Sequence, residues 1–170
     1  VIPPRLAPIQ VVIVPIYKGD EGLAKVSEVA NAIKAKLQAK GISVKYDNRD
    51  TQKPGWKFAE YELKGVPVRI AIGPRDMENN SVEVARRDTK EKAVYQTTDL
   101  DVKIEHLLNQ IQENIYNKAL TMRDASTWKA DSMDEFINIL DNKGGFVYAH
   151  WDGTTETELK IKELTKATIR

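Results

Sequence analysis

The sequence predicts an α/β protein in two parts, a first domain with a mixed sheet and a smaller α/β domain after it. Three observations support this prediction. Residues 9–17 (IQVVIVPIY) form a nearly continuous β-branched run, which is typical of a strand covered on both faces. An amphipathic helical pattern follows at 21–40 and a second β run at 42–46, which together indicate a strand–helix–strand unit with a right-handed crossover. The pattern changes near Asp124, where we expect the boundary between the two domains.

The helices of the first domain are predicted from apolar spacing and from their end signals. Within 21–40 the apolar positions recur at spacings of three and four, and Gly41 stands where a left-handed C-cap is favoured. Pro54 can open a short second helix that ends at Gly65. A long third helix begins at Leu100, and its buried stripe is expected to comprise Ile104, Leu108, Ile111 and Ile115.

Alternation predicts the remaining strands. Residues 66–72 (VPVRIAI) place Val66, Val68, Ile70 and Ile72 on one face of a strand and Arg69 on the other. The stretches 81–87 (SVEVARR) and 92–97 (KAVYQT) complete the mixed sheet.

The second domain is predicted from a capping signal and two further patterns. Ser132 with Glu135 three residues later forms a capping box that opens a helix, whose buried residues are expected to be Met133, Phe136, Ile137 and Leu140. Residues 146–151 (FVYAHW) are strand-like, and 154–170 is a charged terminal helix.

Composition excludes several classes of protein. The 26 basic and 25 acidic residues nearly cancel, so no bulk positive field indicates a general nucleic-acid binder, and DNA is not an expected partner. Cysteine is absent, which excludes disulfides and thiolate zinc sites. No apolar run is long enough to span a bilayer, and residues 1–10 lack the layout of a signal peptide, so we expect a cytoplasmic protein.

The sequence also lacks the motifs of a self-sufficient active site. Its two histidines, His106 and His150, lie far apart, and neither a nucleophile elbow nor a Walker lysine loop is present. Residues 18–22 (KGDEG) follow the first strand, but Asp20 and Glu21 would repel a phosphate and instead suit the start of a helix.

Four long stretches carry a specific resemblance to a known family. They are PPRLAPIQVVIVPI (3–16), PGWKFAEYELKGVPVRIAIGPRD (54–76), RRDTKEK (86–92) and GGFVYAHWDGTTETELKIKELTKATIR (144–170). With them, the chain resembles the C-terminal part of prolyl-tRNA synthetases of the form found in archaea, eukaryotes and some bacteria. The resemblance implies a class II aminoacyl-tRNA synthetase anticodon-binding domain at 7–124, with a five-stranded mixed sheet flanked by three helices. It also implies the family's additional C-terminal α/β domain at 125–170.

The resemblance implies that the catalytic machinery lies outside these residues. Residues 1–6 match the end of the third class-defining motif, and Arg5 matches an arginine that contacts ATP in the intact enzyme. In this chain, Arg5 is expected to lie without contacts at a frayed N-terminus. The chain is therefore expected to be an excised fragment, monomeric and inactive alone, without a cofactor of its own. The intact enzyme is expected to be a homodimer that uses ATP with magnesium.

One departure from the family concerns zinc. Many relatives carry zinc-binding cysteines in the C-terminal domain, and this chain has Asp152 at one of those positions. No metal is expected, because one aspartate cannot make a site. The last domain is also expected to be incomplete, since relatives continue beyond Arg170.

The segment 54–78 is the expected site of RNA recognition. Proline anticodons carry guanine at the second and third positions, and an unpaired guanine offers N–H donors, acceptors and a stacking face. Carboxylates, arginines and an aromatic ring answer these groups, and the resemblance assigns the role to Phe58, Glu62, Arg69, Arg75 and Asp76. Phe58 and Glu62 are i,i+4 on the short helix and share a face. Arg75 and Asp76 follow the Gly73–Pro74 turn, in a loop at a sheet edge.

Other residues near this segment receive secondary roles. Ala59 and Leu63 are expected to face the core, Glu60 to play no part, and Trp56 and Tyr61 to be structural. Weaker candidates for RNA contacts, to phosphate or in support of the first group, are Arg49, Asp50, Lys57 and Arg86.

Two alternatives to the anticodon stem-loop of proline tRNA as the partner stay open. The domain could belong to a synthetase for threonine, histidine or glycine, or to a non-synthetase with the same fold. It could also be a protein-interaction module or a flavodoxin-like binder of small molecules at the carboxyl ends of its strands.

Overall fold

The computed structural model describes residues 1–169, in two compact units, Val1–Tyr116 and Asn117–Arg170. The division falls inside the long helix α4 (Leu100–Ala125), ahead of the boundary predicted near Asp124. Ile115 is the last residue of α4 that packs against the core of the first unit, which accounts for the earlier position.

The first unit contains the predicted five-stranded mixed sheet. Its strand order is β2-β1-β3-β4-β5, with β2, β1 and β3 mutually parallel and β4 and β5 antiparallel to their neighbours. The strands are β1 (Val11–Pro15), β2 (Val44–Tyr46), β3 (Val68–Ile72), β4 (Ser81–Arg86) and β5 (Lys92–Gln96). The fold agrees with that of a class II synthetase anticodon-binding domain.

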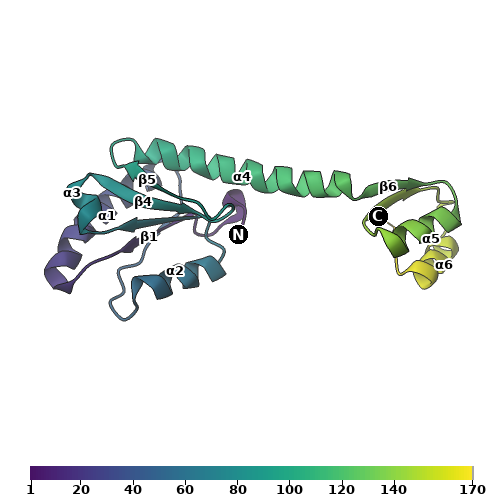
Figure 1. Ribbon diagram of the computed structural model, residues 1–170, viewed down its shortest axis with the longest axis horizontal. Coiled ribbons are helices and arrows are strands. Elements are labelled where there is room, and N and C mark those ends of the chain that lie inside the picture. Colours follow the sequence, from purple (N-terminus) through teal and green to yellow (C-terminus); the bar gives the residue numbers. More distant parts are fainter. Residues whose placement is uncertain (170) are drawn as a thin grey trace. The chain divides into compact units, whose positions relative to one another are not determined.

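Helices cover the two faces of this sheet unequally. Helix α1 (Gly19–Ala39) and the first part of α4 pack on one face and form the larger core, which also receives Met77 of the short helix α3 (Pro74–Glu78). Helix α2 (Pro54–Leu63) lies on the opposite face (Figure 1). The predicted stripe of α4 is confirmed, with Ile104, Leu108 and Ile111 buried and Ile115 partly buried.

The face beside α2 has only a small apolar cluster, in which Val12 and Val14 of β1 pack with Tyr61, Val66 and part of Phe58. The residues of β4 and β5 on this face are left partly or largely exposed, and they are Glu83, Ala85, Lys92 and Val94. Part of the sheet therefore remains accessible next to α2.

Two details of this face differ from the prediction. Val66 packs on the side of α2 and not with Val68, because β3 begins only at Val68 and the alternation does not extend back through Pro67. Ala59 is exposed and Leu63 is 91% exposed, whereas Lys57 and Tyr61 are the residues that α2 buries.

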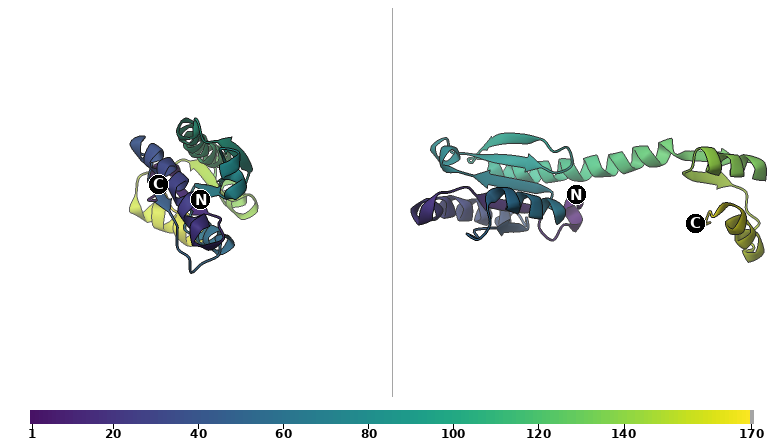
Figure 2. Two further views of the ribbon diagram at one scale, coloured as in Figure 1. Left: turned by 90° about the vertical axis from the view of Figure 1, so that its left-hand side faces the viewer. Right: turned by 60° about the horizontal axis from the view of Figure 1, so that its bottom comes forward.

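The N-terminal residues pack against the first unit. A 3-10 turn, η1 (Pro4–Leu6), has Pro4 buried, and the backbone N–H of Ile2 donates to Gly65 O at 2.9 Å. The N–H of Arg5 donates to Gln112 Oε1 at 3.1 Å. Figures 1 and 2 show this segment beside the carboxyl end of α2. The expectation of a frayed terminus was therefore wrong for the backbone, although the Arg5 side chain is exposed.

The second unit is a small α/β arrangement of its own. Strands β6 (Thr127–Ala130) and β7 (Phe146–Ala149) pair in parallel, α5 (Met133–Asn142) connects them, and α6 (Thr155–Thr165) follows. The sequence did not predict β6. Ser132 caps α5 as predicted, its Oγ accepting from the N–H of Glu135 at 3.2 Å. Met133 is exposed, however, and Ile139 is the most deeply buried residue of this helix.

The terminal helix is shorter than predicted. It ends at Thr165, and Arg170, the last residue of the predicted helix, lies outside the described residues. Within residues 1–169, every helix falls short of the length or the apolarity that crossing a bilayer requires.

Candidate nucleic-acid interface

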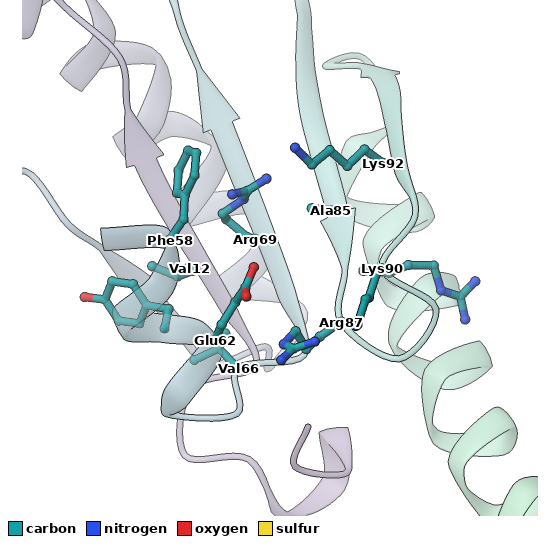
Figure 3. A pocket seen from close by; sticks show the side chains of 11 residues that line it. Val12, Phe58, Glu62, Val66, Arg69, Ala85, Arg87, Lys90 and Lys92 are labelled. Atoms are coloured by element: carbon teal, nitrogen blue, oxygen red, sulfur yellow. The ribbon is translucent and has the colours of Figure 1, made fainter. Parts of the chain in front are cut away.

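A cavity of about 300 Å³ opens between α2 and the exposed part of the sheet. Its lining contains two aromatic rings, one carboxylate and five cationic side chains (Figure 3). The aromatic and charged residues that line it are Phe58, Tyr61, Glu62, Arg69, Arg86, Arg87, Lys90 and Lys92. This mixture suits a ligand that is both flat and polar.

Arg69 and Phe58 form the centre of the cavity wall. The guanidinium carbon of Arg69 lies 3.6 Å from the centroid of the Phe58 ring, a close cation–π contact. Arg69 Nη2 donates to Glu83 Oε1 at 3.1 Å, and its Nε is buried without an acceptor among the described residues. Burial lowers the pKa of Arg69, and the charges of Glu83 and Glu62 oppose that shift. Arg69 is thus held in the cavity wall by Phe58 and Glu83.

Glu62 supplies the carboxylate of the cavity. It lies one helical turn after Phe58 on α2 and is exposed. Figure 3 shows its carboxylate directed into the space between α2 and Arg69. Within residues 1–169 this carboxylate makes no hydrogen bond or ion pair, so both of its oxygens are available to accept from a ligand.

Arg75 and Asp76 do not line this cavity. They lie past the carboxyl end of β3, whereas Arg69 is near its amino end. The predicted loop is in fact helix α3, and Asp76 Oδ2 accepts from the N–H of Gly73 at 2.8 Å, which caps its first turn. The Arg75 side chain is exposed, with no ion pair among the described residues. The structure thus brings three of the five predicted residues together and places two elsewhere.

Lys57 does not fit its predicted role as an RNA contact. Its side chain is 1% exposed, and its Nζ donates to the carbonyl oxygens of Asp47 and Arg49 at 3.0 and 2.5 Å. The Asp47 carboxylate, also 1% exposed, lies 3.8 Å away. Burial lowers the pKa of Lys57, and Asp47 opposes the shift. Lys57 therefore fixes the loop between β2 and α2 from inside the fold.

Arg49 is half-exposed at the surface of the same loop. It donates to both oxygens of Asp47, at 2.9 and 2.6 Å, and to Glu60 Oε2 at 2.5 Å, and it lies 5.6 Å from the Trp56 ring centroid. These bonds from Arg49 lower the pKa of Asp47 to about 2, against the opposing effect of burial. Glu60, expected to play no part, is thus an ion-pair partner.

The other two secondary candidates differ from each other. Asp50 is exposed and makes no hydrogen bond within residues 1–169. Arg86 donates to both oxygens of Asp88, at 2.8 and 2.6 Å, and Asn114 of α4 donates to the same carboxylate at 2.7 Å. Burial would raise the pKa of Asp88, but the bonds from Arg86 and Asn114 outweigh it and the pKa is lowered. Arg86 therefore joins the β4–β5 turn to α4.

Three lining residues were missed from the sequence, namely Arg87, Lys90 and Lys92. The alternation of β4 contained the signal for Arg87, because residues 83, 85 and 87 share a face with Arg69 of the neighbouring strand. The signal for Lys92 is its pairing with Ala85, which requires the register of the hairpin.

The described residues offer no site for a metal. Within 1–169, no group of three or more histidine, cysteine, aspartate or glutamate side chains is arranged to hold an ion. Asp152 accepts hydrogen bonds from Thr154 and Thr157, which lower its pKa and fix the start of α6. Thr154 is the N-cap of α6, and Asp152 orients it.

Comparison with protein families assigns both units. Residues 10–114 match the anticodon binding domain, and residues 133–170 match the C-terminal region of prolyl-tRNA synthetase. The first match covers more than half of the chain and contains the cavity described above.

Individual relatives agree with these matches. Over all 170 residues, the chain is 56% identical to a proline–tRNA ligase of Christiangramia forsetii, 59% to one of Flavobacterium psychrophilum and 58% to one of Porphyromonas gingivalis. It spans 35%, 35% and 34% of the lengths of these relatives. All three are bacterial proteins. Residues 133–170 are similar to the prolyl-tRNA synthetase C-terminal region, and the chain belongs to the anticodon-binding domain family.

Proposed function

We propose that this chain recognises the anticodon of proline tRNA as part of a longer proline–tRNA ligase. The family match supports binding of tRNA, and the names of the relatives support proline as the amino acid. The same support disfavours a threonine, histidine or glycine synthetase, a protein-interaction module and a flavodoxin-like binder.

The observation that carries the proposal is the arrangement of Phe58, Glu62 and Arg69 around one cavity. Guanine presents N1–H and N2–H on its Watson–Crick edge, and the free carboxylate of Glu62 can accept from both. Phe58 provides a ring on which a base can stack, and Arg69 can donate to O6 or N7. One guanine thus finds a partner for its donors, its acceptors and its face.

Arg75 and Asp76 supply a second position at the other end of β3. Proline anticodons contain two adjacent guanines, so two separate sets of polar groups are needed. Asp76 Oδ2 is engaged by Gly73, but its other oxygen makes no hydrogen bond among the described residues, and Arg75 is exposed. We assign this pair to the neighbouring guanine.

The finer assignments belong to the whole protein. We propose that it is the form of the enzyme found in archaea, eukaryotes and some bacteria, a cytoplasmic homodimer that joins proline to its tRNA with ATP and magnesium. Arg5 would contact ATP there. The 170 residues contain no catalytic motif, so they should not catalyse proline-dependent ATP–pyrophosphate exchange. We also propose that they are monomeric, because the resemblance implies that dimerisation occurs mainly through the catalytic domain.

The test is the preference for guanine over inosine, which lacks the N2 amino group. Proline tRNA with inosine at either guanine position is compared with normal tRNA, as kcat/KM of aminoacylation by the longer enzyme. Glu62→Gln should reduce the preference at one position by roughly 12- to 150-fold, the range of about 1.5–3 kcal/mol for one hydrogen bond to a charged group.

Glu28→Gln is the matched control, because Glu28 is an exposed carboxylate on α1 without an ion pair within residues 1–169. Glu60 is unsuitable as a control, because it makes ion pairs with Arg49 and Lys64. An unchanged guanine preference in the variants of all five predicted residues would refute the proposed function.

A further inference from the structure

Three cations of the cavity lining have no ion-pair partner among the described residues. Arg69 pairs with Glu83 and Arg86 pairs with Asp88, but Arg87, Lys90 and Lys92 make no ion pair within residues 1–169. In the described part of the chain, Glu62 is the one carboxylate that lines the same cavity. The rim formed by the β4–β5 hairpin is therefore a local positive patch on a chain whose formal net charge is only +1.

Two donors of this cavity are also left without an acceptor. The Nε atoms of Arg69 and Arg87 are buried, and neither has a hydrogen-bond partner within residues 1–169. Buried donors are normally satisfied, and one that is not requires an explanation. Both Nε atoms are themselves enclosed, so the two guanidinium groups contribute charge to the cavity lining. Together with two unpaired lysines, they suit a ligand that brings several negatively charged oxygens.

The backbone of the hairpin positions the residues that carry these cations. The backbone N–H of Arg87 donates to Pro67 O at 2.9 Å, which ties the turn to the start of β3. Lys90 has a φ of 66°, in the left-handed region that a non-glycine residue adopts only where the turn requires it. Figure 3 shows Lys92 extending toward Arg69 and Arg87 lying near Glu62, so the cations border the space that holds the base-recognising groups.

We infer that Arg87, Lys90 and Lys92 bind a phosphodiester of the anticodon loop, next to the base held by Phe58 and Glu62. This inference rests on the proposed function for its partner. A phosphodiester fits better than a carboxylate of a protein partner, because the cations adjoin an aromatic ring and a free carboxylate. An acidic peptide would be repelled by Glu62, whereas a nucleotide brings a donor edge for Glu62 and an anion for the hairpin.

The test measures the affinity of the 170-residue chain for the anticodon stem-loop of proline tRNA as a function of salt. Each lost phosphate contact to a single strand should reduce the slope of log K against log salt by about 0.7. We expect such a reduction for Arg87→Gln, Lys90→Asn and Lys92→Gln. Asparagine is chosen at position 90 because it tolerates the left-handed conformation. Since Arg87 is partly buried, the two exposed lysines provide variants that do not disturb the fold.

The matched control is Lys36→Gln, an exposed lysine of α1 without an ion pair in the described part of the chain, whose slope should stay as in the wild type. A slope that is unchanged in all three hairpin variants would overturn the inference. The inference would also be overturned if Lys36→Gln lowered the slope as much as the hairpin variants do. General electrostatic attraction to RNA would then explain the change in slope. Inorganic phosphate, substituted for chloride at constant ionic strength, should compete only weakly with the stem-loop. Strong competition by phosphate would instead assign the site to a free anion.

An inosine-containing stem-loop separates this inference from the proposed function. The hairpin variants should weaken binding of the guanine and inosine stem-loops equally, because a phosphate contact carries no base identity. If the wild-type chain showed no guanine preference but the hairpin variants still had a lower salt slope, the phosphate site would stand and base recognition would be refuted. If the wild-type chain preferred guanine but the hairpin variants had unchanged salt slopes, base recognition would stand and the phosphate site would be refuted.

Discussion

The guanidinium of Arg69 lies 3.6 Å from the centroid of the Phe58 ring and covers one face of it. A base that stacks on Phe58 must therefore use the other face or take the place of Arg69. Because Arg69 is also held by Glu83, this contact fixes the Phe58 ring before any RNA binds. Preorganisation of this kind lowers the ordering cost of binding.

Replacing Phe58 tests this relationship. Phe58→Leu keeps an apolar side chain but removes the ring, and it should weaken binding of the anticodon stem-loop by about 1–3 kcal/mol. Arg69→Gln should also weaken binding, and the double variant should lose less than the sum of the two, because the residues act together. The measurement is Kd by fluorescence anisotropy. Leu63→Ala is the control, since this leucine of α2 is 91% exposed and lies outside the cavity lining. Strictly additive losses would contradict the coupling.

The buried Asp47 makes the free energy of unfolding of the first unit depend on pH in the acidic range. Its pKa is lowered to about 2 in the folded chain by the bonds from Arg49, below its ordinary value of 3.8. The stabilisation is therefore fully present above pH about 4 and is lost as the pH falls through about 2, and it amounts to on the order of 2 kcal/mol. Chemical denaturation between pH 2 and pH 7, in wild type and Asp47→Asn, measures it.

The variant should lose stability at pH 7 and show a flatter acid profile. Asp50→Asn removes a neighbouring carboxylate that is exposed and without a hydrogen bond among the described residues, so it is the control. If Asp47→Asn kept the acid dependence of the wild type, the carboxylate responsible would have to lie elsewhere.

The sequence predicted the sheet and the long helices well because periodicity alone determines them. The β-branched run of β1, the stripe of α4 and the alternation that turns Arg69 away from Ile70 are each decided by local spacing. Within residues 1–169, the helices and strands described include all the elements predicted from these patterns.

The face of α2 could not be predicted in this way. A periodic pattern counts a lysine as polar and a leucine as apolar, which favours burial of Leu63 over Lys57. The structure buries Lys57 because the backbone carbonyl groups of Asp47 and Arg49 and the Asp47 carboxylate lie opposite it. Those groups lie outside α2, in the loop that precedes it. The polar partners that compensate for burial of the Lys57 charge therefore become apparent only in the folded structure. The hairpin lysines were missed for a similar reason, since their position depends on strand register.

Gly145 should be the most sensitive glycine of the second unit. It has a φ of 95°, and a Cβ there would lie 2.2 Å from the carbonyl oxygen of Ser126, a backbone atom that cannot move aside easily. Gly145→Ala should therefore lower the midpoint of unfolding of this unit, followed through the fluorescence of Trp128. The neighbouring Gly144 is the control, because its φ is 67° but a Cβ would meet nothing within 4 Å. Gly144→Ala should cost only about 1 kcal/mol. Equal losses in the two variants would show that conformation, and not the clash, is decisive.

Asp76 combines a structural role with a proposed one, and two substitutions separate them. Its Oδ2 accepts from the N–H of Gly73 at the start of α3, and an asparagine oxygen can accept the same bond. Asp76→Asn should therefore keep the thermal stability of the first unit, whereas Asp76→Ala should lose about 1 kcal/mol. If the carboxylate accepts from guanine, Asp76→Asn should nevertheless lose preference for guanine over inosine at one anticodon position, because an amide presents one acceptor where the carboxylate presents two. Melting curves and paired stem-loop affinities measure the two effects. Glu78→Gln, an exposed carboxylate of the same helix, should change neither. An Asp76→Asn variant with an intact guanine preference would confine Asp76 to the cap.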